Sequence, residues 1–212
     1  MIERYTNPEM GHIWTLQHEF EVMLDVEIAA CEAMAELGEI PKEAAKNIRA
    51  KAKFDLPRVK EIEKVTNHDI IAFLTNVAEY VGDDSKYIHK GLTSSDVKDT
   101  ALGIMMKKSA DIIIEDIKKL REVLLRRADE HRHTPCIGRT HGIHAEPMTL
   151  GLKFALWYSE LGRDLKRIEN ARENIAVGKL SGAVGTYSNI DPRIEELVCK
   201  KLGLTPVPLA TQ

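Results

Sequence analysis

An uninterrupted helix-forming segment between Thr93 and Pro135 constrains the fold of this chain more than any other feature. Residues 93–96 read Thr-Ser-Ser-Asp, which matches the Ser/Thr-x-x-Asp/Glu pattern of a helix start, and no proline follows until Pro135. The pattern predicts one helix of about 37 residues, which at about 1.5 Å per residue would be roughly 55 Å long. A compact globule of this size has a radius of gyration of only about 17 Å. We therefore expect the helix to extend beyond its own domain.

Apolar residues in this segment come in triplets that cover more than one face of a helix. Three consecutive residues sweep about 200° around a helix axis. The triplets are Ile104-Met105-Met106, Ile112-Ile113-Ile114 and Val123-Leu124-Leu125. A single amphipathic stripe does not explain this pattern, so we expect neighbours on two faces, from other parts of the chain or from other subunits.

The remaining segments also favour helices, and the predicted fold class is all-α. A second long helix is expected from Pro147 to about Val177, antiparallel to the first. No strand pattern is sustained enough to predict a sheet. Shorter helices are expected over residues 7–38, from Pro41, over residues 58–66 and 70–81, and from Asp191 to Gly203.

The short helices before Thr93 and the long helices after it predict two domains. We assign residues 1–92 to a loop-rich helical N-terminal domain and residues 93–212 to the first part of a domain of long bundled helices. The abrupt end at Gln212, directly after a Pro-Val-Pro loop, predicts that a C-terminal remainder lies outside this chain.

Composition excludes several classes of protein. The 30 basic and 33 acidic residues give a net charge of −3, and they are interleaved, so no nucleic-acid partner is expected. Three widely spaced cysteines without a Cys-x-x-Cys pair argue against disulfides and a zinc ribbon. The chain lacks a signal peptide and an apolar run of about 20 residues, so we expect no membrane partner and a cytoplasmic location.

Residues 138–147 hold the densest group of reactive side chains, Gly-Arg-Thr-His-Gly-Ile-His-Ala-Glu-Pro. The glycines predict a loop, with Pro147 as the first residue of the next helix. His141 and His144 could bind a metal ion, fill a polar loop or transfer protons. A zinc site needs further ligands. Because imidazole titrates near neutral pH and Thr140, Glu146 or Arg139 could orient it, we favour proton transfer.

Three further segments carry groups suited to binding anions. His68 precedes an apolar helix whose free N–H groups could bind an anion, although Asp69 could simply cap that helix. The hydroxyls of Thr93 and Ser94 are helix caps that could also hold a carboxylate. His89 adds another group able to carry positive charge.

Five segments, in this order along the chain, resemble the fumarase/aspartase superfamily of lyases. They are Ile-Glu-Arg-Tyr at residues 2–5, Asn-His-Asp at 67–69, Gly-Leu-Thr-Ser-Ser-Asp at 91–96, the decapeptide at 138–147, and Gly-Lys-Leu-Ser-Gly-Ala-Val-Gly-Thr at 178–186. The Gly-Arg-Thr-His core is shared across the superfamily. The opening Arg-Tyr pair and His-Gly-x-His-Ala-Glu-Pro resemble its adenylosuccinate lyase branch.

The resemblance implies an all-helical homotetramer in which long helices from four subunits form a 20-helix bundle and each active site takes residues from three subunits. It implies β-elimination of fumarate from adenylosuccinate, giving AMP, and from the succinyl-carboxamide ribotide SAICAR, giving AICAR, in purine biosynthesis. It implies neither a cofactor nor a metal.

The resemblance also implies roles for individual residues. His141 would be the general acid, and His68 would assist at the leaving group and the phosphate side. Substrate binding is assigned to Arg4, Tyr5, Asn67, His68, Asp69, His89, Thr93, Ser94, Thr140 and Gln212. Among these, Arg4 and Tyr5 would hold the phosphate region, Asn67 to Asp69 would line the nucleotide pocket, Thr93 and Ser94 would bind the succinyl carboxylates, and Gln212 would meet the substrate from the other side. Many relatives carry a basic residue in place of Asn67.

One family signature has no counterpart here. The mobile Ser-Ser-x-Met-Pro-x-Lys-x-Asn loop, which supplies the serine thought to act as base, is missing from these residues. We therefore expect the chain alone not to complete the reaction. Two alternatives stay open: a sister lyase such as argininosuccinate lyase or a cycloisomerase, and a non-catalytic helical assembly module.

Overall fold

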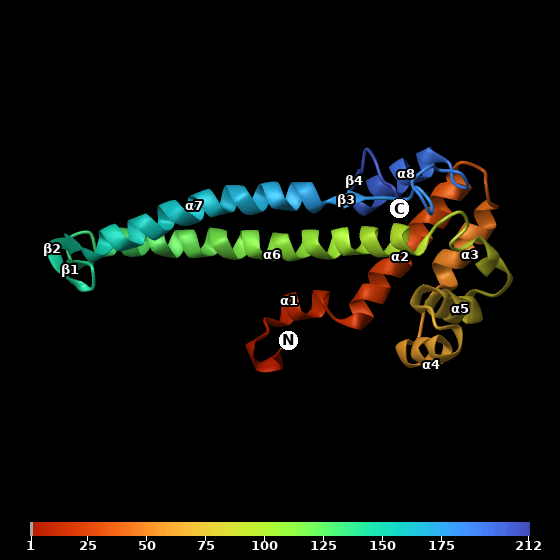
Figure 1. Cartoon of the computed structure of the whole chain (residues 1–212), viewed down its shortest axis with the longest axis horizontal. Coiled ribbons are helices and arrows are strands. Elements are labelled where there is room, and N and C mark those ends of the chain that lie inside the picture. Colours follow the sequence, from red (N-terminus) through yellow and green to blue (C-terminus); the bar gives the residue numbers. More distant parts are fainter. Residues whose placement is uncertain (1) are drawn as a thin grey trace. The chain divides into compact units, whose positions relative to one another are not determined.

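The computed structural model describes residues 2–212, apart from the side chain of Glu3, and divides into two compact units. The first unit comprises Met1–Lys108 and Ile175–Gln212, and the second comprises Ser109–Asn174. The helix α6 (Ser94–Glu130) begins in the first unit and continues into the second, as Figure 1 shows. The units thus divide the chain differently from the expected boundary at Thr93, and that boundary stays a prediction.

The first unit consists of helices around α2. Its elements are η1 (Glu3–Tyr5), α1 (Pro8–Ile13), α2 (Leu16–Glu36), α3 (Lys42–Lys51), α4 (Leu56–Thr66), α5 (Asp69–Val81), η2 (Gly82–Tyr87), the start of α6, β3 (Val177–Gly178), α8 (Pro192–Leu202) and β4 (Thr205–Pro206). The helix α2 packs against α3 and α8, and α4 packs against α5. The short strands β3 and β4 pair in parallel.

Apolar residues of α2 and α5 form the core of this unit. Phe20 of α2 contacts Phe73 of α5 at a ring-centroid distance of 5.1 Å, and Phe54 lies 5.6 Å from Phe73. Phe73 is fully buried, and burial of such a side chain contributes about 1.5–3 kcal/mol. The regularly spaced apolar residues of α2 and α5 therefore lie on the face that each helix buries.

The expected single helix over residues 7–38 is wrong, because the chain leaves helical geometry at Thr15. There φ is −77° and ψ is 146°, and the Thr15 hydroxyl caps α2 by accepting from the His18 N–H at 3.2 Å. The other helices are present within a few residues of their predicted bounds. The residues predicted to start or end helices do so: Asn7 and Asp191 are N-caps, and Gly203 ends α8 in the left-handed region.

The second unit is an antiparallel helix pair joined by a hairpin. Figure 1 shows α7 (Leu150–Ile175) running back along α6 from the hairpin of β1 (Pro135–Thr140) and β2 (Ile143–Thr149). The Arg172 guanidinium pairs with Asp111, and the Arg121 guanidinium lies 4.4 Å from the Tyr158 ring centroid. Long-range pairs between α6 and α7 thus hold the two helices together within this unit.

Two predictions for this segment are wrong. The decapeptide forms a hairpin rather than a loop, and α7 begins at Leu150 rather than Pro147. Pro147 lies opposite Ile137 in the strand register. The two strands are too short to show a sustained strand pattern in the sequence. Proline is compatible with them because it is tolerated at the edge of a sheet. The all-α fold class is nevertheless confirmed, since helices make up most of the chain.

The apolar triplets of α6 have unequal exposure. Ile114 and Leu124 are 7% and 6% exposed, whereas Ile113 and Leu125 are 40% and 54% exposed. One face of the helix is therefore buried and another presents apolar side chains. Of the helices in the described part of the chain, none is long and apolar enough to cross a membrane.

Candidate active site

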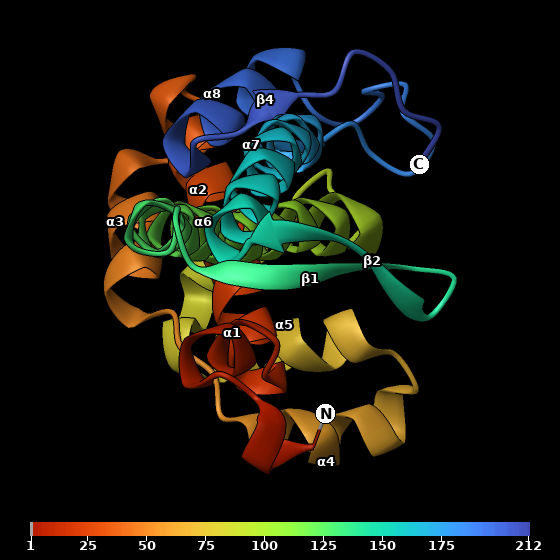
Figure 2. The same cartoon turned by 90° about the vertical axis from the view of Figure 1, so that its left-hand side faces the viewer.

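His141 occupies the turn of the β1–β2 hairpin in the second unit. Thr140 pairs with Ile143, so His141 and Gly142 are the two central residues, with φ of 51° and 75°. Positive φ at both positions is typical of the type I′ turns that connect two strands tightly. Figure 2 views the helix pair end-on and shows the turn extending away from the helix ends. The hairpin thus holds His141 at an exposed tip.

A bulge at Gly138 sets the position of this tip. The strand register shifts between Ile137 and Arg139, and a Cβ at Gly138 would lie 2.8 Å from the Glu146 carbonyl oxygen. Only glycine allows the strands to approach this closely. His144 pairs with Arg139 in the register, and Thr140, His141 and His144 are all exposed. No hydrogen bond from residues 2–212 holds the His141 ring, so its nitrogens are open to a ligand.

The N-terminus of α6 is built around Asp96 in the first unit. Asp96 is fully buried and accepts from the Thr93 N–H at 2.9 Å, as expected for the carboxylate of the Thr-Ser-Ser-Asp pattern, whereas the caps expected from the Thr93 and Ser94 hydroxyls stay a prediction. Its Oδ1 lies 2.8 Å from Lys179 Nζ, and it accepts from the N–H groups of Ser181 and Gly182, each at 3.1 Å. Asp96 therefore joins two of the sequence motifs, residues 91–96 and 178–186.

These two motifs line one small pocket. Gly91 has φ of +76°, and a Cβ there would lie 2.2 Å from the Asn189 carbonyl oxygen. The pocket has a volume of about 460 Å³ and is lined by Lys90, Gly91, Leu92, Ala183 and Asn189. Thr93 and Ser94 follow directly at the N-terminus of α6, where backbone N–H groups and the helix dipole favour an anion.

The Asn-His-Asp segment is the junction between α4 and α5. Asn67 ends α4 with φ of 50°, and His68 is the N-cap of α5, its Nδ1 accepting from the Ile71 N–H at 3.3 Å. The imidazole therefore caps the helix from its N-cap position, and Asp69 Oδ1 accepts from the Ile70 N–H at 2.8 Å in the first turn. Asp69 lies 2.6 Å from Lys98 Nζ on α6. Lys98 is one turn beyond Ser94, so this ion pair brings the His68 segment to the first turns of α6.

His89 already has a partner within the first unit. Its Nδ1 lies 2.6 Å from Glu27 Oε1, and its backbone N–H donates to Glu27 Oε2 at 3.0 Å. Burial disfavours the imidazolium, but the hydrogen bond to Glu27 and the negative charges of Glu27 and Asp96 together outweigh it and raise the pKa of His89. His89 has φ of 63°, and the pair fixes this turn ahead of the Gly91 motif.

The remaining predicted residues lie in exposed segments of the first unit. Arg4 and Tyr5 form η1, with the guanidinium 4.8 Å from the Tyr5 ring centroid, and both are exposed. Gly185 packs against the backbone of Ala210, because a Cβ there would lie 1.9 Å from the Ala210 carbonyl oxygen. This contact holds Ala210, two residues before Gln212, against the glycine-rich segment.

The structure thus gathers part of the predicted site. Residues 67–69, 91–96, 178–186 and the chain end belong to the first unit, and residues 138–147 belong to the second. Three ion-pair partners were not predicted from the sequence: Glu27, Lys98 and Lys179. Lys179 stands inside a recognised motif, which is the one signal that could have drawn attention to it. Within residues 2–212, neither His141 nor His144 joins a group of three potential metal ligands.

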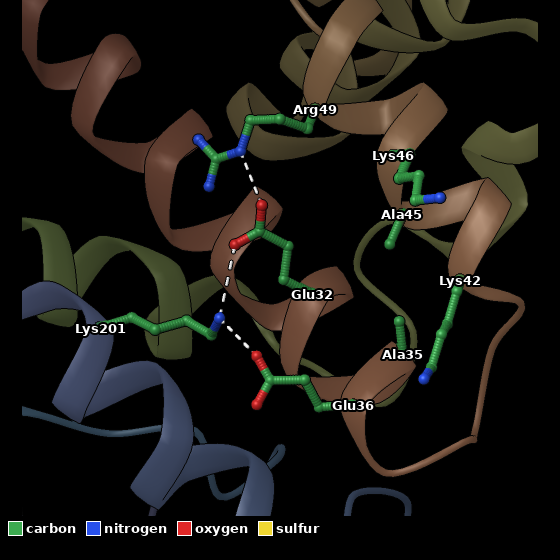
Figure 3. Close-up of a pocket in the computed structure, with 8 residues that line it drawn as sticks. All are labelled: Glu32, Ala35, Glu36, Lys42, Ala45, Lys46, Arg49 and Lys201. Carbon is green, nitrogen blue, oxygen red and sulfur yellow. Dashed lines mark hydrogen bonds and ion pairs between the residues drawn. The ribbon is translucent and has the colours of Figure 1, made fainter.

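A cavity larger than the Gly91 pocket lies elsewhere in the first unit and is shown in Figure 3. It has a volume of about 700 Å³ between α2, α3 and α8. Arg49 donates to Glu32 at 2.7 Å, and Lys201 lies 2.6 Å from Glu36. The Arg49 hydrogen bond lowers the pKa of Glu32. These ion pairs connect α2 to α3 and to α8.

Comparison with known proteins gives a consistent set of relatives. A family model described as Lyase matches residues 3–212. The chain is 57% identical to the adenylosuccinate lyase of Synechocystis sp. and 53% identical to that of Bacillus subtilis, in each case over all 212 residues. Both alignments cover 49% of the relative. The chain therefore spans about half the length of the curated relatives it matches.

Solved structures show the same fold. The fumarate lyase from Mesorhizobium sp. BNC1 superposes with a TM-score of 0.90 at 28% identity, covering 96% of this chain and 50% of that one. The beta-carboxy-cis,cis-muconate cycloisomerase from Acinetobacter calcoaceticus sp. ADP1 gives the same TM-score, identity and coverage. The helical arrangement is therefore shared by proteins whose names describe different reactions.

Proposed function

The chain belongs to the lyase family whose model matches residues 3–212, and from this premise we propose that it forms part of an adenylosuccinate lyase. The proposed reaction is the β-elimination of fumarate from adenylosuccinate and from SAICAR in purine biosynthesis, in the cytoplasm. The observation that carries the proposal is identity of 50–57% to adenylosuccinate lyases along the whole chain.

In this reaction a base removes the proton next to a succinyl carboxylate, and an acid protonates the departing nitrogen. We assign the acid to His141. Its support is the hairpin geometry: the ring is exposed, and no described residue occupies its nitrogens. His68 assists at the leaving group and the phosphate side. The base is supplied by a part of the enzyme other than these residues.

The carbanion-like intermediate needs positive charge or N–H groups around its carboxylates. We assign this role to Thr93 and Ser94 at the start of α6. The Asp96 carboxylate does not cancel the attraction there, because Lys179 neutralises it at 2.8 Å. Arg4, Tyr5, Asn67, Asp69, His89, Thr140 and Gln212 complete the substrate-binding set on the strength of the family resemblance.

We further propose a homotetramer with active sites shared between subunits. Exposed apolar residues on two long helices support it, since a second set of helices would cover them. On α6 they include Ile113 and Leu125, and on α7 they include Leu152 and Trp157.

A chimaera tests the reaction directly. Residues 1–212 replace the corresponding half of the Bacillus subtilis relative, and fumarate release is followed by absorbance with adenylosuccinate and with argininosuccinate. We expect release from adenylosuccinate alone. Release from argininosuccinate alone would identify a sister lyase and contradict the proposal.

The same chimaera separates an enzyme from an assembly module. A general acid contributes about 10²–10⁴-fold to the rate, so His141→Ala should lower fumarate release by that factor. His133→Ala, which changes another exposed imidazole, is the matched control and should retain the parent rate. Equal rates for both variants would mean that His141 has no catalytic role.

A cycloisomerase activity is the second candidate, because two solved structures of muconate-converting enzymes superpose with TM-scores of 0.90 and 0.89. The identity to them is 28% and 29%, about half of that to the adenylosuccinate lyases. We therefore rank it below the first candidate.

A further inference from the structure

The junction between α1 and α2 brings two imidazoles together. His12 lies in the last turn of α1 and His18 in the first turn of α2, with ring centroids 4.7 Å apart. Thr15 fixes both backbones: its hydroxyl donates to the His12 carbonyl at 2.9 Å and accepts from the His18 N–H at 3.2 Å. The break in the predicted helix therefore has a consequence, because it sets the two histidines side by side.

A carboxylate completes this cluster. Glu21 lies one turn beyond His18 on α2, with its Oε2 3.2 Å from His18 Nδ1. Gln17 donates to the other carboxylate oxygen, Oε1, at 3.0 Å. The contacts to Gln17 and His18 thus hold the orientation of the Glu21 carboxylate.

The three residues have the donor types and spacing of a transition-metal site. One ligand atom from each of His12, His18 and Glu21 lies within 4.8 Å of the other two, and this is the one such group of three found among residues 2–212. Ligand atoms in a tetrahedral zinc site, with bonds of about 2.0–2.2 Å, lie roughly 3.3 Å apart. The 3.2 Å between His18 and Glu21 already matches this spacing.

Access and support also fit a metal site. The His18 side chain is 13% exposed and the Glu21 side chain 45%, so the cluster is anchored on one side and reachable from solvent on the other. Gln17 orients the carboxylate as an outer-shell residue orients a metal ligand. Two imidazoles and one carboxylate with an open position suit Zn²⁺ and the related ions Co²⁺ and Ni²⁺.

We propose that His12, His18 and Glu21 form a binding site for one divalent transition-metal ion, with water in the remaining position. The ion connects α1 to α2 and fixes the direction in which the segment before α1 leaves this junction. This site is separate from the proposed elimination chemistry, and its test does not depend on lyase activity.

The test uses the 212-residue chain without an affinity tag, stripped of metal with a chelator and titrated with Co²⁺. Visible absorption reports coordination, and competition with Zn²⁺ gives its affinity. We expect one equivalent of Co²⁺ to bind with the absorption of a tetrahedral or five-coordinate site. His12→Ala and Glu21→Gln should each weaken binding at least about tenfold, since even outer-shell changes cost that much.

Matched controls keep the result interpretable. His133→Ala and Glu43→Gln change an exposed imidazole and an exposed carboxylate outside the cluster and should leave the affinity unchanged. His18→Ala removes a mostly buried side chain, so the fold of this variant is checked by circular dichroism. His12→Ala changes an exposed side chain and decides the question if His18→Ala unfolds. Absence of Co²⁺ binding up to millimolar concentration, or equal affinities for His12→Ala and His133→Ala, would overturn the proposal.

Discussion

The buried start of α6 and the exposed hairpin turn place polar groups in opposite circumstances. Asp96 is fully buried and accepts hydrogen bonds or an ion pair from four groups. His141 is exposed, and no described residue engages its ring. The first arrangement uses its polar atoms to connect segments of the chain, whereas the second leaves its polar atoms for a molecule from outside.

This contrast separates two kinds of motif residue by their physical role. A buried, fully paired carboxylate is costly to disturb, because its partners are left without compensation. Replacement of an exposed imidazole on a turn has little effect on the free energy of folding. It affects only the molecule that the imidazole binds. Stability and activity measurements should therefore respond in opposite ways at the two positions.

Disturbing Asp96 should have the largest effect on stability. Asp96→Asn leaves the buried Lys179 ammonium without its counter-charge, so we expect the free energy of unfolding to fall by about 3–5 kcal/mol. Urea denaturation of the 212-residue chain measures it. Asp129→Asn is the control, since its side chain is 78% exposed and its change should stay within about 0.5 kcal/mol. Equal losses would mean that Asp96 does not organise the α6 start.

The Glu27–His89 pair should give a smaller, pH-dependent effect. The pKa of His89 is raised in the folded state. The protonated imidazole therefore contributes its full stabilisation below the pKa of a free histidine, about 6.5. That contribution is lost as the pH rises through the pKa of His89 in the folded protein. Glu27→Gln should cost about 1.5–3 kcal/mol at low pH and less at high pH. Unfolding free energies at several pH values check this. A cost that grows with pH would contradict the assignment.

Two glycines with nearly the same φ extend the comparison to the backbone. Gly91 and Gly142 have φ of +76° and +75°, but a Cβ meets the Asn189 carbonyl oxygen at 2.2 Å in the first case and open space in the second. Alanine at either position costs about 1–2 kcal/mol for the left-handed conformation, and Gly91→Ala should cost about 1–3 kcal/mol more for the steric overlap. Denaturation curves of the two variants would contradict this if they coincided.

Helices were predictable here because their signals are local. The caps at Asn7, Asp55 and Asp191 accept from N–H groups two or three residues ahead, and each can be read from neighbouring letters. The hairpin was not, because its strands are short and carry no apolar alternation. A His-Gly pair between two short extended runs was the available signal, since histidine tolerates the left-handed region better than most residues.

Pairs between residues far apart in the sequence were not predicted, for a different reason. The ion pair of Asp96 with Lys179 spans 83 positions, and the hydrogen bond of His89 with Glu27 spans 62. No local pattern fixes which distant charge meets which. Motif resemblance supplied the candidate residues, but their supporting partners came from the packed structure.

The most direct test of the account replaces His141 with asparagine. Asn-Gly is a favoured type I′ pair, so His141→Asn should leave the thermal midpoint of the chain unchanged or slightly raised. In the chimaera with the Bacillus subtilis relative, the same change should lower fumarate release from adenylosuccinate by about 10²–10⁴-fold, as expected for the loss of a general acid. Retained fumarate release in a stable His141→Asn chimaera would contradict the central claim that this turn holds the acid.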